Sequence, residues 1–155
     1  MFFRKYQNKK GVTLIEIITV VAILGILAGI SVNVFRSVSN AKTLDKEAEI
    51  ILSYINRTRT NAINSLNLEA HGVSFASSSV TIYYGTNATT AASSSVYTLG
   101  AGHTISSVSL SNHATNFYFN KLSGEPSATG TITIENSSHE TKTITVYGTG
   151  LCEVE

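Results

Sequence analysis

The sequence predicts an α+β protein in which one long N-terminal helix packs on a C-terminal head of antiparallel β-sheet. Two periodicities support this prediction. Up to about residue 66, apolar residues recur at helical spacing and no proline interrupts them. After Leu68 the period changes to two, and short runs of β-forming residues alternate with turns rich in Gly, Ser, Asn and Thr. The chain of 155 residues has room for one modest domain.

The first 34 residues combine a basic start with an apolar run. Residues 1–10 contain four basic side chains and no acid. The segment Val12–Ile30 is apolar except for Thr13, Glu16 and Thr19. About twenty apolar residues in a helix span a hydrocarbon core of ~30 Å. We therefore expect residues 12–34 to cross a membrane, with the N-terminus cytoplasmic because of its positive charges and the head on the other side.

Glu16 separates this segment from simpler targeting signals. A secretory signal peptide is disfavoured, because the apolar run is too long and no small-x-small cleavage site closes it. A plain signal anchor explains the length and the charges but not a carboxylate, which costs roughly 2.5–3.5 kcal/mol at a bilayer centre. Cleavage after Gly11 would make Val12 a free ammonium one helical turn from Glu16. The acid could then neutralise this amine in its own or a neighbouring subunit.

The run from Lys9 to Glu16, KKGVTLIE, resembles the signature of type IV pilins and type II secretion pseudopilins. This resemblance implies a leader peptide, 1–11, that a prepilin peptidase removes after Gly11. It also implies methylation of Val12 and a role for Glu16 as the acid needed for filament assembly. The implied partners are the peptidase, other pilins or pseudopilins, an inner-membrane assembly platform and membrane lipid. The implied location is the bacterial cytoplasmic membrane, and then a pilus or pseudopilus.

The helical pattern continues beyond the apolar run as an amphipathic segment, 35–68. A single helix over Val12–Leu66 would be about 80 Å long. Arg59 falls on the apolar stripe, so we expect its stem to be buried and its guanidinium to reach a carbonyl or an acid. For Gly25 and Gly29 we favour close helix packing over local melting. The expected stripe consists of Val34, Val38, Ala41, Leu44, Ala48, Leu52, Ile55, Ala62 and Leu66; the expected solvated face consists of Lys42, Asp45, Lys46, Glu47, Glu49 and Arg57.

The remaining residues, 69–155, are expected to form the β-rich head. The two Thr-Ile runs at 131–134 and 143–146 predict a hairpin with a polar loop. The predicted strands are Gly72–Phe75, Val80–Tyr84, Val96–Leu99, Thr104–Leu110, Asn116–Phe119, Gly130–Glu135, Thr141–Tyr147 and Leu151–Val154.

One branch of the pilin family resembles this head more than the others do. The run Arg59–Ile63 is similar to the Arg-x-x-Ala-Ile helix end of GspH/FimT-type minor pseudopilins. Phe117–Leu122 followed by Gly124, Gly130–Ile134 and the strand after Gly150 are similar to the closing strands of that branch. This resemblance implies a minor subunit that acts in assembly or initiation.

Several other functions are disfavoured. Without residues 1–10 the chain has seven basic and ten acidic residues, or a charge of about −3, and its last residues, 150–155, are acidic, so nucleic acid is an unlikely partner. Asp45 is the single aspartate, which leaves no calcium loop, and Cys152 alone cannot form an intrachain disulfide. We expect Cys152 to be a buried small hydrophobic residue. The four histidines, His71, His103, His113 and His139, are expected at turns or on the surface.

No catalytic constellation, metal site or cofactor is predicted, so we do not expect an enzyme. The favoured function is a structural subunit, a minor pilin or pseudopilin, of a type IV pilus-like or type II secretion filament. The alternative is a tip adhesin or DNA-capture minor pilin, for which Tyr83, Tyr84, Tyr97, Phe117 and Tyr118 could supply a surface patch. A membrane-anchored enzyme is a distant third.

Overall fold

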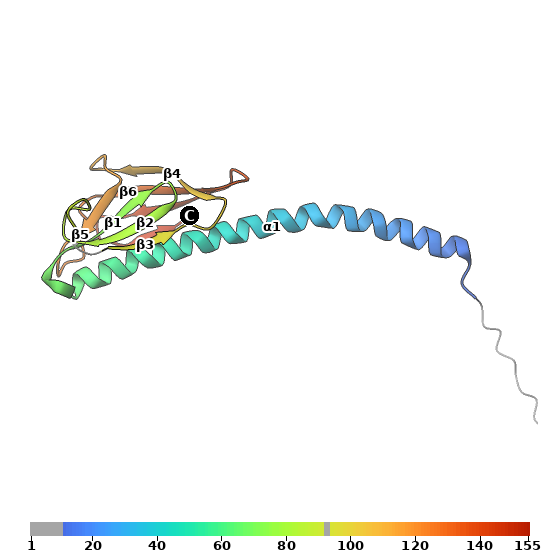
Figure 1. The fold of residues 1–155 in the computed structure, drawn as a ribbon, viewed down its shortest axis with the longest axis horizontal. Coiled ribbons are helices and arrows are strands. Elements are labelled where there is room, and N and C mark those ends of the chain that lie inside the picture. Colours follow the sequence, from blue (N-terminus) through green and yellow to red (C-terminus); the bar gives the residue numbers. More distant parts are fainter. Residues whose placement is uncertain (1–10, 92–93) are drawn as a thin grey trace, which may run out of the picture. The chain divides into compact units, whose positions relative to one another are not determined.

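The computed structural model of the chain describes residues 11–91 and 94–155, apart from the side chains of residues 30–39 and 94. Residues 1–10, which make up most of the predicted leader peptide, lie outside the described residues. The described residues form a long helix, a short 3-10 helix and eight strands (Figure 1). The chain divides into two compact units, Met1–Val38 and Ser39–Glu155, which are treated separately below.

The long helix, α1, covers Leu14–Ile63 and is shorter at both ends than the predicted Val12–Leu66. Its C-terminal end is followed by Ser65, whose backbone is left-handed with a φ of 49°. A right-handed helix cannot continue through a left-handed residue. Leu66, which was expected to extend the apolar stripe, instead begins the 3-10 helix η1 (Leu66–Leu68) and is 47% exposed.

The part of α1 in the first unit exposes its aliphatic side chains. From Val12 to Leu27, each large aliphatic side chain is between 47% and 78% exposed. In the described part of the chain, no helix has both the length and the apolar character that crossing a membrane requires. The predicted membrane-spanning segment, 12–34, is therefore not confirmed.

In the second unit, α1 buries a stripe of small and aliphatic side chains at helical spacing. Thr58 also lies on this stripe, fully buried, and its hydroxyl donates to the Tyr54 carbonyl at 2.8 Å, so that no polar group is left unpaired there. Leu52, predicted to be central, is only partly buried, and Ile51 takes its place. The buried members are Leu44, Ala48, Ile51, Ile55 and Ala62.

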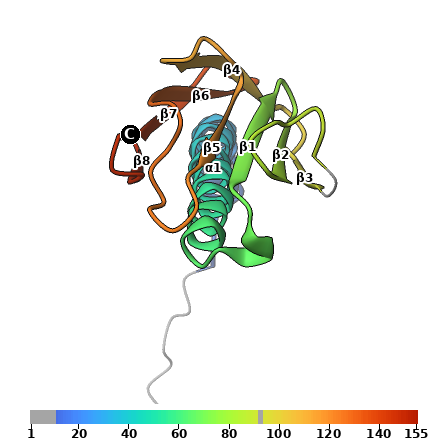
Figure 2. The ribbon, with the colours of Figure 1, turned by 90° about the vertical axis from the view of Figure 1, so that its left-hand side faces the viewer.

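The strands form two four-stranded antiparallel sheets, where the sequence predicted antiparallel sheet without dividing it. The first has the order β3-β2-β1-β5 and the second β4-β6-β7-β8. In Figure 2, β1, β2 and β3 lie to one side of α1 and β8 to the other, with β4 and β6 above it. The strand bounds are β1 (His71–Ala76), β2 (Ser79–Tyr84), β3 (Ser94–Thr98), β4 (His103–Leu110), β5 (Asn116–Phe119), β6 (Gly130–Asn136), β7 (Thr141–Val146) and β8 (Cys152–Val154).

The predicted hairpin is confirmed as β6 and β7. Thr131 pairs with Thr145 and Ile132 with Ile144, so the isoleucines of both strands point to one face. Ile132, Ile134 and Ile144 are fully buried there. They join the stripe of α1 and residues of the first sheet, such as Val73 and Phe117, in a single hydrophobic core.

Glu47 departs from the prediction, because it is 7% exposed instead of lying on the solvated face. Its Oε1 accepts a hydrogen bond from the Tyr97 hydroxyl at 2.8 Å and another from the Gly100 N–H at 3.0 Å. These two hydrogen bonds replace some of those that the carboxylate would form with water if it were exposed. Burial and, next, the hydrogen bond to Glu47 raise the pKa of Tyr97 to about 12. Glu47 therefore fixes α1 to β3 and to the turn that follows it.

Arg59 is half-buried, and its guanidinium reaches backbone carbonyls, as predicted. Its Nε donates to the Gly124 carbonyl at 3.2 Å, and its Nη2 donates to the Thr149 carbonyl at 3.1 Å. The two carbonyls belong to loops that are distant in sequence, so one guanidinium ties both loops to the end of α1. Cys152 is buried in the core, as expected, and its burial raises the pKa of the thiol to about 11.

We predict that Arg59→Met lowers the free energy of unfolding by about 1–2 kcal/mol, because two carbonyls lose a charged donor while the stem is replaced by a similar apolar chain. The bond to Thr149 is exposed, which keeps the loss in the lower part of the usual range. Urea unfolding would measure the change. The matched control is Arg57→Met on the exposed face of α1, expected to stay within about 0.5 kcal/mol. Equal losses in both variants would contradict the prediction.

Candidate processing and assembly segment

The residues predicted to be cut and methylated lie just before α1. Gly11, Val12 and Thr13 have no regular secondary structure, and the helix starts at Leu14. Apart from the adjoining chain, none of the described residues has an atom within 4 Å of the position that a Cβ on Gly11 would take. In the described residues, the bond between Gly11 and Val12 is therefore part of an open, non-helical stretch, as a protease needs.

Thr13 is the N-cap of α1. Its Oγ1 accepts a hydrogen bond from the backbone N–H of Glu16 at 3.3 Å, which satisfies one of the four free N–H groups at the helix start. Thr-x-x-Glu is the sequence of a capping box, and this bond is half of one. A carboxylate in the first turn also interacts favourably with the positive end of the helix dipole. Glu16 thus has a structural use in addition to the assembly role predicted for it.

The other hydroxyl in the apolar run is satisfied within the helix. Thr19 donates to the carbonyls of Ile15 at 3.0 Å and Glu16 at 2.9 Å. With Thr13 and Thr19 both bonded to the backbone, this stretch presents little polarity at its surface besides the Glu16 carboxylate. Among the described residues, that carboxylate forms no ion pair.

The two glycines of the apolar segment, Gly25 and Gly29, lie where a side chain would have free space. For both Gly25 and Gly29, none of the described residues beyond the adjoining chain lies within 4 Å of the position of an added Cβ. The described side chains before them, Ile23, Leu24, Ile26 and Leu27, are aliphatic and exposed. Exposed apolar surface of this extent is typical of a region that lipid or another protein covers. Whether the glycines pack against a second helix stays a prediction.

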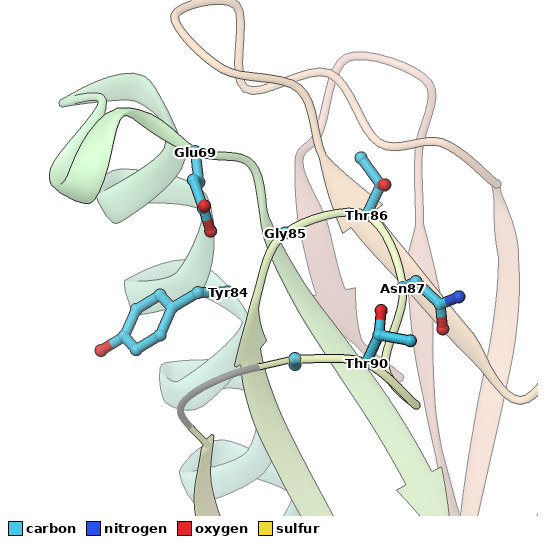
Figure 3. Close-up of a pocket in the computed structure, with 7 residues that line it drawn as sticks. Glu69, Tyr84, Gly85, Thr86, Asn87 and Thr90 are labelled. Carbon is cyan, nitrogen blue, oxygen red and sulfur yellow. The ribbon is translucent and has the colours of Figure 1, made fainter.

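The head contains a shallow polar cavity of about 220 Å³, shown in Figure 3. Its only charged side chain is Glu69, and hydroxyl and amide groups provide most of the remaining lining. The amide of Asn87 is engaged locally, since its Oδ1 accepts from the Thr89 N–H at 2.9 Å. The lining residues are Glu69, Tyr84, Gly85, Thr86, Asn87, Thr90 and Ala91.

The histidines do not converge on a metal site. In the part of the chain that the structure covers, no three His, Cys, Asp or Glu side chains are grouped for a metal ion. His113 and His139 lie on the exposed surface, as predicted. His71, in contrast, is fully buried and its Nε2 lies 2.9 Å from the Leu66 carbonyl, because β1 begins in the core. His103 is half-buried at the start of β4.

Comparison with known proteins matches the N-terminal segment. Residues 6–32 match a family described as the prokaryotic N-terminal methylation motif. This region includes Gly11, Val12 and Glu16. The chain therefore carries a type IV pilin-like prepilin signal. No curated protein and no solved structure gives a significant match to the chain.

We predict that Thr13→Ala destabilises the first turn of α1 by about 1 kcal/mol, because the Glu16 N–H loses its side-chain acceptor. Exchange of the Glu16 amide hydrogen, measured in micelles, should become about fivefold faster. Thr13→Ser keeps a hydroxyl at the cap and should exchange like the wild type. Equal exchange in Thr13→Ala and the wild type would show that the cap contributes nothing.

Proposed function

We propose that the protein is a structural subunit, a minor pilin or pseudopilin, of a type IV pilus-like or type II secretion filament. The observation that carries this proposal is the methylation motif over residues 6–32, located at the start of a helix whose large aliphatic side chains are exposed as far as Leu27. A surface of this kind needs a cover of lipid or of other subunits. In a subunit that moves from a membrane into a filament core, lipid covers this surface first and other subunits cover it afterwards.

In this proposal, a prepilin peptidase removes residues 1–11 and methylates Val12. The open stretch Gly11–Thr13 supports this step, because the bond to be cut is not part of the helix. The segment 12–34 holds the precursor in the bacterial cytoplasmic membrane, with the basic leader on the cytoplasmic side. The other partners are an inner-membrane assembly platform and the neighbouring pilins or pseudopilins.

The Glu16 carboxylate acts after cleavage, when the subunit is added to the filament. Cleavage creates an ammonium at Val12, and the carboxylate can pair with this group on a neighbouring subunit. Two opposite charges attract more strongly in apolar surroundings than in water, and leaving either one unpaired there is costly. The pair would therefore set how far one helix slides along the next during assembly.

The assignment to a minor, assembly-type subunit rests on the head. The Arg59–Ile63 run is similar to the helix end of GspH/FimT-type minor pseudopilins, and Arg59 forms a clamp on two closing loops. These contacts give the Arg-x-x-Ala-Ile run a structural role at the end of α1. The acidic end, 150–155, favours assembly over DNA capture.

We predict that incubation with prepilin peptidase shortens the precursor by residues 1–11 and leaves Val12 as the first residue. Mass spectrometry would identify the new N-terminus and its methyl group. Gly11→Leu should stay uncut because the side chain blocks the peptidase, and since nothing lies near Gly11 the change should not disturb the fold. An uncleaved wild-type chain, or a different first residue, would disprove the proposal.

We further predict that Glu16→Ala is cleaved and inserted into the membrane almost normally but is excluded from filaments, since the Val12 ammonium then has no partner. The amount of subunit in sheared filaments, relative to the membrane fraction, would measure incorporation. Glu49→Ala removes an exposed acid elsewhere on α1 and should be incorporated normally. Normal incorporation of Glu16→Ala would remove the role assigned to this carboxylate.

A further inference from the structure

The unit Ser39–Glu155 carries an apolar surface around the C-terminal end of α1, the end that faces the viewer in Figure 2. Three segments form this surface: the end of α1 with η1, the loop after β5, and the loop before β8. Each of its aliphatic side chains is at least 36% exposed. We call this surface the end patch; it consists of Ile63, Leu66, Leu68, Leu122 and Leu151.

Backbone contacts bring these three segments together. The Leu122 N–H donates to the Ala62 carbonyl at 3.1 Å, which joins the loop after β5 to the last turn of α1. The Arg59 guanidinium reaches a carbonyl in each of the two loops. A Cβ on Gly150 would collide with the Gly124 carbonyl, so the loop that carries Leu151 lies directly against the loop that carries Leu122. The end patch is therefore one surface and not a set of scattered side chains.

Two leucines of the end patch have a strained backbone. Leu68 has a φ of 59° and Leu122 a φ of 69°, in the left-handed region that a bulky residue adopts only at a cost in free energy. They are also the two most exposed large hydrophobic side chains among the described residues of this unit, at 76% and 69%. Neither burial within the chain nor backbone preference explains a leucine at these positions. Strained residues of this kind gather at binding surfaces, which indicates that a partner covers both side chains.

The charges beside these leucines indicate which partner fits. Glu69 follows Leu68, and Lys121 precedes Leu122; both charged side chains are exposed. Among the described residues, neither forms an ion pair within the chain, and Glu125 in the loop of Lys121 forms none either. The end patch thus has a leucine with an acid on one side and a leucine with a base on the other. A second copy of the same surface would supply the opposite charge to each, whereas a hydrocarbon layer would supply none.

We propose that the end patch binds the end patch of a second copy of this chain. In such an isologous contact, Glu69 of each copy faces Lys121 of the other, and the leucines cover one another between the two ion pairs. Five side chains form a small interface, so we expect a transient dimer with a dissociation constant of about 0.1 mM. Copies that share a membrane or a filament are held at a high effective concentration, which favours a contact of this strength. The contact does not require cleavage of the leader.

The first test separates a binding role of Leu122 from a structural one. Leu122→Asn removes the apolar side chain, and asparagine tolerates the left-handed backbone better than leucine does. We expect the midpoint of urea unfolding to be equal or higher and the dimer to be about tenfold weaker or more, since each dimer loses two buried leucines. Sedimentation equilibrium of the full chain in neutrally buoyant micelles would measure the dimer. Val96→Thr changes an exposed aliphatic side chain on β3, outside the end patch, and should dimerise like the wild type.

The second test exchanges the two charges. Glu69→Lys and Lys121→Glu should each weaken the dimer by about threefold at low ionic strength, because like charges then face each other. The variant with both changes restores opposite charges and should recover wild-type association. Glu49→Lys alters the net charge equally on the exposed face of α1 and should have no effect.

The rest of α1 is unchanged in all these variants, so differences among them report on the head. A monomeric wild type, or equal dimerisation by Leu122→Asn and the wild type, would overturn the proposal. Failure of the double charge variant to recover would overturn it too. If Leu122→Asn lowers the amount of bound detergent but leaves dimerisation unchanged, the end patch contacts lipid and the proposal is wrong.

Discussion

The buried stripe of α1 is the constraint on which the rest of the second unit depends. The two sheets have separate strand ladders, and a backbone hydrogen bond from the Ile105 N–H in β4 to the Ser77 carbonyl in the β1–β2 turn, at 2.8 Å, connects them. Their inner side chains meet Leu44, Ala48, Ile51 and Ile55 in one core, and each sheet buries its apolar face only because the helix is there. Polar contacts then fix where the helix lies. Glu47 binds the first sheet near one end of the stripe, and Arg59 binds two loops near the other.

Local periodicity predicted most of this fold, and the failures have physical causes. The strands and the β6–β7 hairpin follow from alternation between neighbouring residues, which the sequence displays directly. Their division into two sheets depends on pairings such as β1 with β5, which join distant segments. Glu47 was assigned to solvent by its residue type, although it lies three residues after Leu44 and four before Ile51 on the buried face. The groups that donate hydrogen bonds to it, from Tyr97 and Gly100, belong to another part of the chain, so the local sequence pattern does not predict them.

The N-terminal segment was easier to predict than the end patch, because its chemistry is local. The leader glycine, the acid and the apolar run are all adjacent in sequence, and the methylation motif covers them. The cap between Thr13 and Glu16 could also have been predicted from the Thr-x-x-Glu spacing. The end patch needed three segments that are far apart in the chain, and the left-handed backbone of Leu68 and Leu122 has no signature in the sequence.

The cap also shows how Glu16 can contribute to the helix start and keep its carboxylate for the proposed role in a filament. The hydrogen bond to Thr13 uses the backbone N–H of Glu16, and the side-chain carboxylate takes no part in it. Thr13 and Thr19 bind backbone groups, so neither hydroxyl competes for the acid. The carboxylate is therefore the one ionisable group of residues 12–29 and is available to a cation. A change of charge at residue 16 therefore leaves the cap bond in place and removes only the dipole interaction from the helix start. In the proposed filament, its main effect would be on the contacts between subunits.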